Sequence, residues 1–177
     1  MRPPYLTGDT IHLRAMRGDD AEWAVAWFPS RFPINAARAG EWLKKAHNDF
    51  WNPNPVILAI VRNATDEIVG GMDVDSPGRR RGWVRFHLAP WLSPAEADDV
   101  RAEALRLCVP WLRDEAELMT ITIPIGADET TTISAAEAVG MVLGARLREH
   151  LHRPNGRADL LYYQALNPHW AVPPGDA

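Results

Sequence analysis

The sequence predicts an α/β protein in which helices cover both faces of a central mixed sheet. Three observations indicate this fold: strand-like and helix-like segments alternate, several strand segments are strongly apolar, and neither repeats nor low-complexity blocks interrupt the 177 residues. Apolar strands of this kind need helices on both faces of the sheet to cover them. The length suits one domain, which we assign to residues 1–170, with residues 171–177 as a flexible tail.

The first half of the chain is predicted to begin with a strand and two helices. Polar and apolar residues alternate over TIHLR (residues 10–14), as in a half-buried strand. Asp19 and Glu22 have the spacing of a capping box, which predicts a helix that begins there and stops at Pro29. A second helix is expected from about Ala36 to His47.

Three further strands are predicted to form an antiparallel meander. Residues 52–55 are a rigid proline connector before it, and residues 76–78 are a turn within it. The first strand is apolar throughout and should be buried on both faces. Gly70 and Gly71 indicate a bulge or a close backbone approach in the second. The three segments are VILAIVR (56–62), EIVGGMDVD (67–75) and GWVRFHLAP (82–90).

The second half is predicted to contain two helices, a strand and a hairpin. A helix runs from Pro94 to about Val109, where Pro110 must kink or end it. A strand over residues 118–125 precedes a second helix, over 130–139, which a glycine ends. The last strands are MVLGARLREHLH (141–152) and ADLLYYQAL (158–166), joined by a turn over 153–156 with Asn155-Gly156 as the turn-forming pair.

Composition and charge exclude several classes of protein. The content of 46% hydrophobic and 24% charged residues is that of a folded chain, and the net charge of −4 provides no electrostatic footprint for nucleic acid or an anionic membrane. The single cysteine, Cys108, cannot form an internal disulfide, and His150 and His152 lack a third metal ligand. The longest purely apolar run, Val56 to Val61, is too short to span a membrane. We expect a cytoplasmic protein without a metal, nucleic-acid or membrane partner.

Several phrases of the sequence, in their order, resemble one known family. LTGDTIHLRAMRGDDAEWAVAW, EIVGGMDVD and AAEAVGMVLGARLREHLHRPNGRADLLYYQALNPHW are similar to segments of the GNAT superfamily of N-acetyltransferases. The likeness is greatest to the Rim-type branch, which acetylates ribosomal-protein N-termini and related amines. The anchor positions in the last segment are Gly140, Met141, Leu147, Arg148, Glu149, Asn155, Gly156, Asp159, Tyr162, Leu166 and Trp170.

The resemblance implies a fold, a donor and an acceptor. The fold would be GNAT-like, with a mostly antiparallel twisted sheet. The donor would be acetyl-CoA, the acceptor a primary amine on a peptide or a small molecule, and the protein a monomer or a homodimer. The resemblance places the donor against a strand end and the helix start after it, which here are Leu88, Ala89, Pro90, Ser93, Glu96, Ala97, Arg101 and Thr132.

The segment that should hold the diphosphate departs from the family pattern. The family uses a glycine-rich loop whose backbone N–H groups face the phosphates at a helix start. Here the corresponding segment, WLSPAEADDV, has no glycine, and Ser93 and Glu96 form a capping box with Pro94 at the first helical position. Glu96, Asp98 and Asp99 add negative charge, which repels phosphate. Either the loop still admits CoA with its acidic side chains turned to solvent, or the protein is a binding or regulatory module with weak or no CoA binding.

Candidate catalytic residues follow from the same comparison. His87 is the proton acceptor on its strand, because histidine has an ordinary pKa near 6.5 and the family's glutamate base is missing. Arg85 should share its face, since side chains alternate along a strand, although a surface-facing pair is the plain alternative. Thr132 takes the position of a serine that protonates the leaving thiolate, and Glu129 replaces a neutral amide, although both also suit an ordinary helix start.

The acceptor should be held near the first helices. Aromatic side chains are concentrated there, and aromatic rings form rigid apolar walls. Arg85, Trp27 and Phe32 are therefore the expected acceptor-binding residues.

Overall fold

The computed structural model describes residues 5–28, 30, 34–45, 56–76 and 81–170. The strands are β1 (Leu6–Thr7), β2 (Ile11–Ala15), β3 (Val56–Arg62), β4 (Ile68–Asp75), β5 (Arg81–Leu88), β6 (Thr120–Gly126), β7 (Val142–Arg153) and β8 (Gly156–Leu166). The α-helices are α1 (Ala24–Trp27), α2 (Ala36–Lys45), α3 (Pro94–Asp114) and α4 (Thr130–Ala138), and the 3-10 helices are η1 (Gly18–Trp23) and η2 (Pro168–Trp170).

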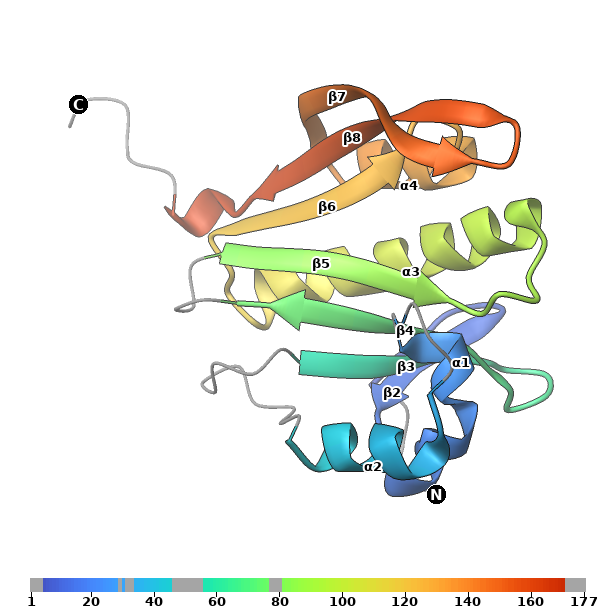
Figure 1. Ribbon diagram of the computed structural model, residues 1–177. Coiled ribbons are helices and arrows are strands. Elements are labelled where there is room, and N and C mark those ends of the chain that lie inside the picture. The colour runs from blue at the N-terminus through green and yellow to red at the C-terminus, as the bar shows by residue number, and fades with distance from the viewer. Residues whose placement is uncertain (1–4, 29, 31–33, 46–55, 77–80, 171–177) are drawn as a thin grey trace, which may run out of the picture.

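The strands form one sheet in the order β1-β2-β3-β4-β5-β6-β8-β7. Neighbouring strands run antiparallel except β5 and β6, which are parallel. Figure 1 shows α3 and α4 behind this sheet and α1 and α2 in front of it. The predicted fold, a mixed and mostly antiparallel sheet with helices on both faces, is confirmed.

β3 lies at the centre of both hydrophobic cores. Its side chains alternate between the core under α3, which includes Leu58 and Ile60, and the core under α1 and α2, which includes Ala59 and Val61. All four are fully buried. Because both faces are covered, the strand is apolar throughout, as the sequence predicted.

Gly70 and Gly71 bring other backbone segments close to β4. A Cβ atom on Gly70 would lie 2.5 Å from the carbonyl oxygen of His87, and one on Gly71 would lie 2.8 Å from the Cβ of Trp27. The register with β3 also shifts beside Gly70, between Ile60 and Val61. The predicted close approach and bulge are therefore both present.

The start of the first helix differs from the prediction. Asp20, rather than Asp19, is the capping carboxylate, and it accepts the Arg17 N–H at 2.7 Å. The same carboxylate accepts two hydrogen bonds from the guanidinium of Arg14, at 2.7 and 2.9 Å, inside the protein. This buried pair draws Asp20 inward, so the predicted Asp19–Glu22 box is wrong.

Two further local predictions need correction. α3 does not end near Val109 but continues through Pro110 to Asp114, and Leu112 beyond the proline is fully buried against the sheet. The central residues of the last hairpin are Pro154 and Asn155, and Gly156 follows them with φ +135°. The predictions for residues 46–47, the 52–55 connector, Pro77 and Gly78, and the 171–177 tail lie outside the described residues.

The sheet splits between its two parallel strands. β5 pairs with β6 only over Arg81–Trp83 and Thr120–Thr122. Beyond this point β5 stays paired with β4 as far as Leu88, while β6 stays paired with β8 as far as Gly126. Figure 1 shows the two strands diverging from their common start. The last residues of β5 therefore face an opening in the sheet.

The close contact of Gly71 with Trp27 predicts a selective sensitivity to added volume. Gly71→Ala should lower the free energy of unfolding by about 1–3 kcal/mol, because the new methyl group meets backbone-anchored atoms that cannot move cheaply. Gly40→Ala is the matched control, because a Cβ on Gly40 would lie 3.8 Å from the Cβ of Ala21, which is an ordinary contact distance. Since Gly40 lies inside α2, where alanine favours the helix, this substitution should be neutral or should stabilise the protein by up to about 1 kcal/mol. Urea denaturation measures both, and equal effects would contradict this account.

Candidate active site

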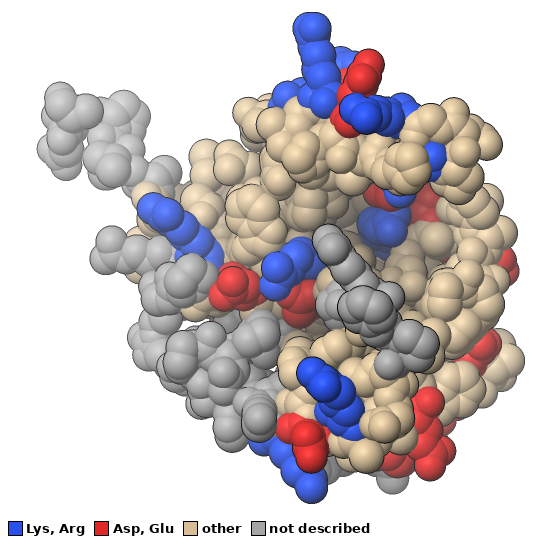
Figure 2. Space-filling view, in the orientation of Figure 1, with Lys and Arg blue, Asp and Glu red and all other residues tan. Residues whose placement is uncertain are grey.

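Two cavities lie near the split in the sheet. The larger, about 800 Å³, is lined by the start of α3, the loop before α4 and the turn between β7 and β8. Figure 2 shows this side of the molecule hollowed below the β7–β8 hairpin, with basic and acidic atoms deep in the hollow. The smaller, about 260 Å³, lies between β3, β4 and β5 and the helices α1 and α2, and is lined by Trp27, Trp42, Ile57, Gly71, Asp73, Arg85 and His87.

β4 and β5 place three polar side chains together in the smaller cavity. Asp73 is opposite Arg85 in the sheet register, and Gly71 is opposite His87. The Asp73 carboxylate lies 2.5 Å from His87 Nε2, accepts a hydrogen bond from Arg85 Nε at 2.8 Å and forms an ion pair with Arg85 Nη2 at 2.7 Å. Its side chain is 9% exposed, so these partners compensate a buried charge. The prediction that His87 and Arg85 line one cleft is confirmed.

The Asp73 contact fixes the state of the His87 ring. An ionised carboxylate can only accept hydrogen bonds, so Nε2 of His87 carries the hydrogen. In the neutral ring Nδ1 is then the proton acceptor. Sequence reasoning missed Asp73, although an acidic residue between the apolar residues Met72 and Val74 was the available signal.

Aromatic rings form the opposite wall of the smaller cavity. Trp27 is buried and its ring centroid lies 5.7 Å from that of Trp42. Because Trp27 Nε1 donates to the Asp20 carbonyl oxygen at 2.9 Å, its ring presents only apolar surface to the cavity. Trp27 and Trp42, both among the aromatic residues of the first helices, line this cavity, and Phe32 lies outside the described residues.

The helix start at the larger cavity is capped by its own side chains. Ser93 Oγ accepts the Glu96 N–H at 3.3 Å, and Glu96 accepts the Ser93 N–H at 3.0 Å, which confirms the predicted capping box. The N–H and the hydroxyl of Ser93 both donate to the Glu96 carboxylate, and these bonds, with the charge of Arg62, hold the pKa of Glu96 below its ordinary value. Pro94 has no N–H, so within the described chain Ala95 supplies the one unpartnered amide of this first turn.

Asp98 links the starts of α3 and α4. Its carboxylate accepts the N–H groups of Thr131 and Thr132 at 2.9 and 3.0 Å, and the Thr132 hydroxyl at 2.6 Å. Burial raises the pKa of Asp98, but these hydrogen bonds outweigh burial and hold the pKa below its ordinary value. The alternative in which the acidic side chains turn to solvent does not hold for Asp98, which is 9% exposed.

Thr132 is fully buried and lines neither cavity. Its hydroxyl donates to Asp98 and therefore cannot also donate to a ligand without breaking that bond. The geometry gives Thr132 a place in the contact between two helices.

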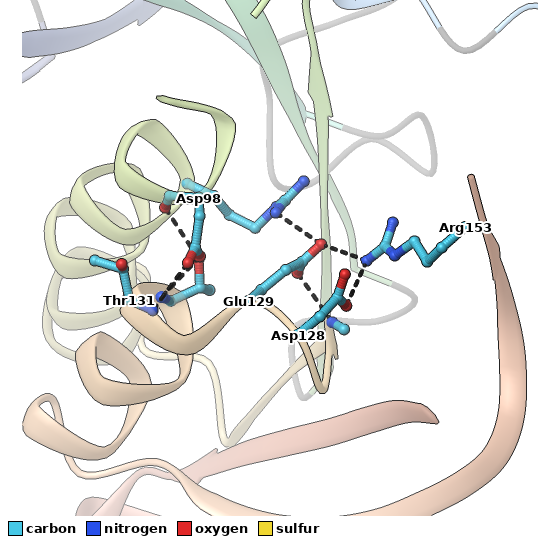
Figure 3. Close-up of polar contacts among 8 residues, drawn as sticks. Asp98, Asp128, Glu129, Thr131 and Arg153 are labelled. Atoms are coloured by element: carbon cyan, nitrogen blue, oxygen red, sulfur yellow. Dashed lines mark hydrogen bonds and ion pairs between the residues drawn. The ribbon is translucent and has the colours of Figure 1, made fainter. Parts of the chain in front are cut away.

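A charged cluster crosses the larger cavity. Glu129 Oε1 lies 2.9 Å from both Arg101 and Arg153, and Glu129 Oε2 accepts the Gly126 N–H at 2.9 Å. Arg153 also contacts Asp128 at 3.0 Å. Figure 3 shows Glu129 and Asp128 directed toward Arg153, from the loop before α4 to the β7 strand. Burial opposes the charge of Arg153, but its two carboxylate partners prevail and raise its pKa.

Comparison with known proteins identifies the family. Residues 1–142 match the family model described as an acetyltransferase (GNAT) domain. The chain belongs to the GNAT acetyltransferases. GNAT proteins take the acetyl group from acetyl-CoA, which makes the larger cavity the candidate donor site.

Solved structures agree with this assignment. A protein from Sphaerobacter thermophilus, assigned as an acetyltransferase, is 50% identical, with TM-score 0.75 over 96% of this chain and 99% of that one. The fold is shared with the ribosomal-protein-S5-alanine acetyltransferase of Vibrio fischeri (14% identity, TM-score 0.66, 94% and 98% coverage). It is also shared with the microcin C7 self-immunity acetyltransferase, solved with acetyl-CoA and AMP (14% identity, TM-score 0.62, 90% and 93% coverage). A search of curated proteins found no match.

The larger cavity has the volume and the cationic side chains that acetyl-CoA requires. It lacks the free backbone N–H groups at a helix start that the family uses to bind phosphate. The volume lies within the usual range for ligand pockets, and Arg101 and Arg153 can bind phosphate. Of the donor contacts expected from the sequence, Ala97 and Arg101 line this cavity. Its lining does not include Leu88, Ala89, Pro90, Ser93, Glu96 or Thr132.

Two searches concern other classes of site. In the described ranges, no helix has the length and apolar character of a membrane span. No group of three or more histidine, cysteine or acidic side chains in those ranges could hold a metal ion.

The Asp98 bridge predicts a stability effect that depends on pH. Asp98→Ala should lower the free energy of unfolding by about 2–3 kcal/mol at pH 7, because it leaves helix N–H groups without a partner. Since the folded pKa is depressed, this stabilisation is complete above the unfolded pKa of about 4 and is lost as pH falls through the folded value. Denaturant unfolding at pH 7 and pH 3 measures the difference.

Asp99→Ala is the matched control for this prediction. Asp99 is the exposed neighbour on the same helix turn, so its removal should change stability by less than about 1 kcal/mol at either pH. Equal effects of the two substitutions at pH 7 would contradict the bridging role of Asp98.

Proposed function

We propose that the protein transfers an acetyl group from acetyl-CoA to a primary amine, which is a peptide N-terminus or a small amine. The observation that carries this proposal is the Asp73–His87 pair, which holds a proton acceptor beside the split between β5 and β6. The Rim-type resemblance of the sequence favours a peptide N-terminus as the acceptor. The smaller cavity is so small that only the terminal part of such an acceptor can enter it.

Acetyl-CoA supplies an acetyl group activated as a thioester, and the amine nitrogen replaces sulfur at the carbonyl carbon. His87 Nδ1 receives the proton that the amine loses, directly or through a water molecule. Asp73 holds the ring in this tautomer and stabilises the imidazolium that results. The sulfur leaves as a thiolate and takes a proton from solvent, because Thr132 is committed to Asp98.

The walls of the smaller cavity favour an acceptor with an apolar group next to its amine. Trp27 and Trp42 offer aromatic surface, and Ile57 adds an aliphatic one. Arg85 is about half exposed and keeps N–H donors that Asp73 does not use, so it can bind a carbonyl or carboxylate oxygen of the acceptor. Localisation in the cytoplasm, and the choice between monomer and homodimer, stay predictions.

The second candidate function is a GNAT-fold binding or regulatory module with weak or no CoA binding. The Ser93–Glu96 capping box favours it, because the box occupies amides that would otherwise face phosphate. Micromolar binding of CoA to the unmodified protein would eliminate this candidate.

Titration calorimetry and a rate assay test the proposed function together. Acetyl-CoA should bind, and CoA release should be detected with peptides that have free N-termini or with small primary amines. His87→Gln should lower kcat about 100-fold with the Kd of acetyl-CoA changed less than about twofold, because it removes the base and not the donor site.

The control variant is His150→Gln, on the exposed strand β7, which should match the unmodified protein. Absence of heat and of any change in Tm at millimolar acetyl-CoA would contradict the proposed function and favour the binding module. Binding with an unchanged rate in His87→Gln would contradict the role of His87.

A further inference from the structure

Glu129 occupies an unusual position between two arginines of the larger cavity. Arg101 comes from α3 and Arg153 from the end of β7, yet both guanidinium groups converge on the same oxygen, Oε1 of Glu129, at 2.9 Å. Gly126 makes room for the cluster, because a Cβ there would clash with Arg153 and Asp128. Arginine side chains from distant parts of the chain thus surround one anionic oxygen.

Two guanidinium groups around one oxygen are also an arrangement that binds phosphate. Arginine presents a planar set of N–H donors that matches phosphate and carboxylate oxygens alike. Arg153 contacts both of its carboxylates through Nη2, so the guanidinium keeps further N–H donors, of which the one on Nε is buried. The first turn of α3 has few free N–H groups to bind phosphate in place of the arginines, because the Ser93–Glu96 capping box occupies most of them.

We infer that Arg101 and Arg153 form the phosphate-binding pair of the donor site, and that Glu129 competes with phosphate for them. A phosphate group of the donor binds by displacing the Glu129 carboxylate from both arginines. This inference rests on the proposed function, since it concerns the acetyl-CoA that the larger cavity would take.

The charges of the cavity support displacement of Glu129 in particular. Asp98 cannot leave without exposing the N–H groups of α4, whereas Glu129 is bound to the chain through a single backbone N–H, that of Gly126. The charged residues that line the cavity are three arginines and four acidic residues, which sum to −1. Moving the Glu129 carboxylate away brings this sum to zero and frees both arginines, so the repulsion of an incoming phosphate falls.

Calorimetry with acetyl-CoA tests the inference directly. Glu129→Gln keeps the side-chain shape and removes the competing charge, so it should bind acetyl-CoA about tenfold more tightly than the unmodified protein. Arg153→Met should bind it about tenfold more weakly. Glu115→Gln, the same change on an exposed residue at the far end of α3, should leave the Kd within about twofold. Circular dichroism confirms that each variant is folded.

Smaller donors identify the chemical group involved. S-acetylpantetheine has no phosphate, so Glu129→Gln should leave its Kd unchanged. If 3′-dephospho-CoA shows the same gain as acetyl-CoA, the arginines hold the diphosphate, and if the gain disappears, they hold the 3′-phosphate; both results support the inference.

Two outcomes overturn the inference. If the unmodified protein binds acetyl-CoA and Glu129→Gln does not bind it more tightly, Glu129 does not compete with phosphate, so the inference fails while the proposed function stands. If neither protein binds acetyl-CoA, the proposed function fails with it.

Discussion

The three-residue pairing between β5 and β6 lets the two strands diverge, and the larger cavity is lined by the segments that follow their ends. Had these parallel strands remained paired along their full length, the last residues of β5 would be closed in by β6. Instead each strand follows a different antiparallel neighbour, β4 or β8, after Trp83 and Thr122. The bridge from Asp98 to α4 ties the two sides of the split together behind the sheet.

The two cavities share one electrostatic device. In each, a poorly exposed carboxylate binds an arginine and a further donor: Asp73 binds Arg85 and His87, and Glu129 binds Arg153 and Arg101. The consequences differ, however. Asp73 orients a proton acceptor and should remain in place during reaction, whereas Glu129 occupies donors that an anionic ligand requires. We thus propose that one ion pair orients the base for the amine, and that the other competes with phosphate for its arginines.

Local sequence patterns predicted much of the fold, and their failures have a common cause. Alternation in GWVRFHLAP placed Arg85 and His87 on one face, and the Ser93–Glu96 spacing predicted a cap, because both depend only on neighbours in the chain. Asp20 replaced Asp19 as a cap because buried Arg14 pairs with it. The partners Asp73 and Arg153 were missed because strand register and long-range packing bring them to their sites. The burial of Asp98 could not be predicted for the same reason, since its partners Thr131 and Thr132 lie on another helix.

A crystal structure of the protein with acetyl-CoA tests most directly the proposal that the larger cavity holds the donor and that its thioester lies beside His87. The account predicts the thioester between the diverging ends of β5 and β6, near His87, with a phosphate group on Arg101 and Arg153 and the Glu129 side chain turned away. Phosphates seated on the first turn of α3, with Glu129 still bonded to both arginines, would contradict the account. So would a thioester located away from the split.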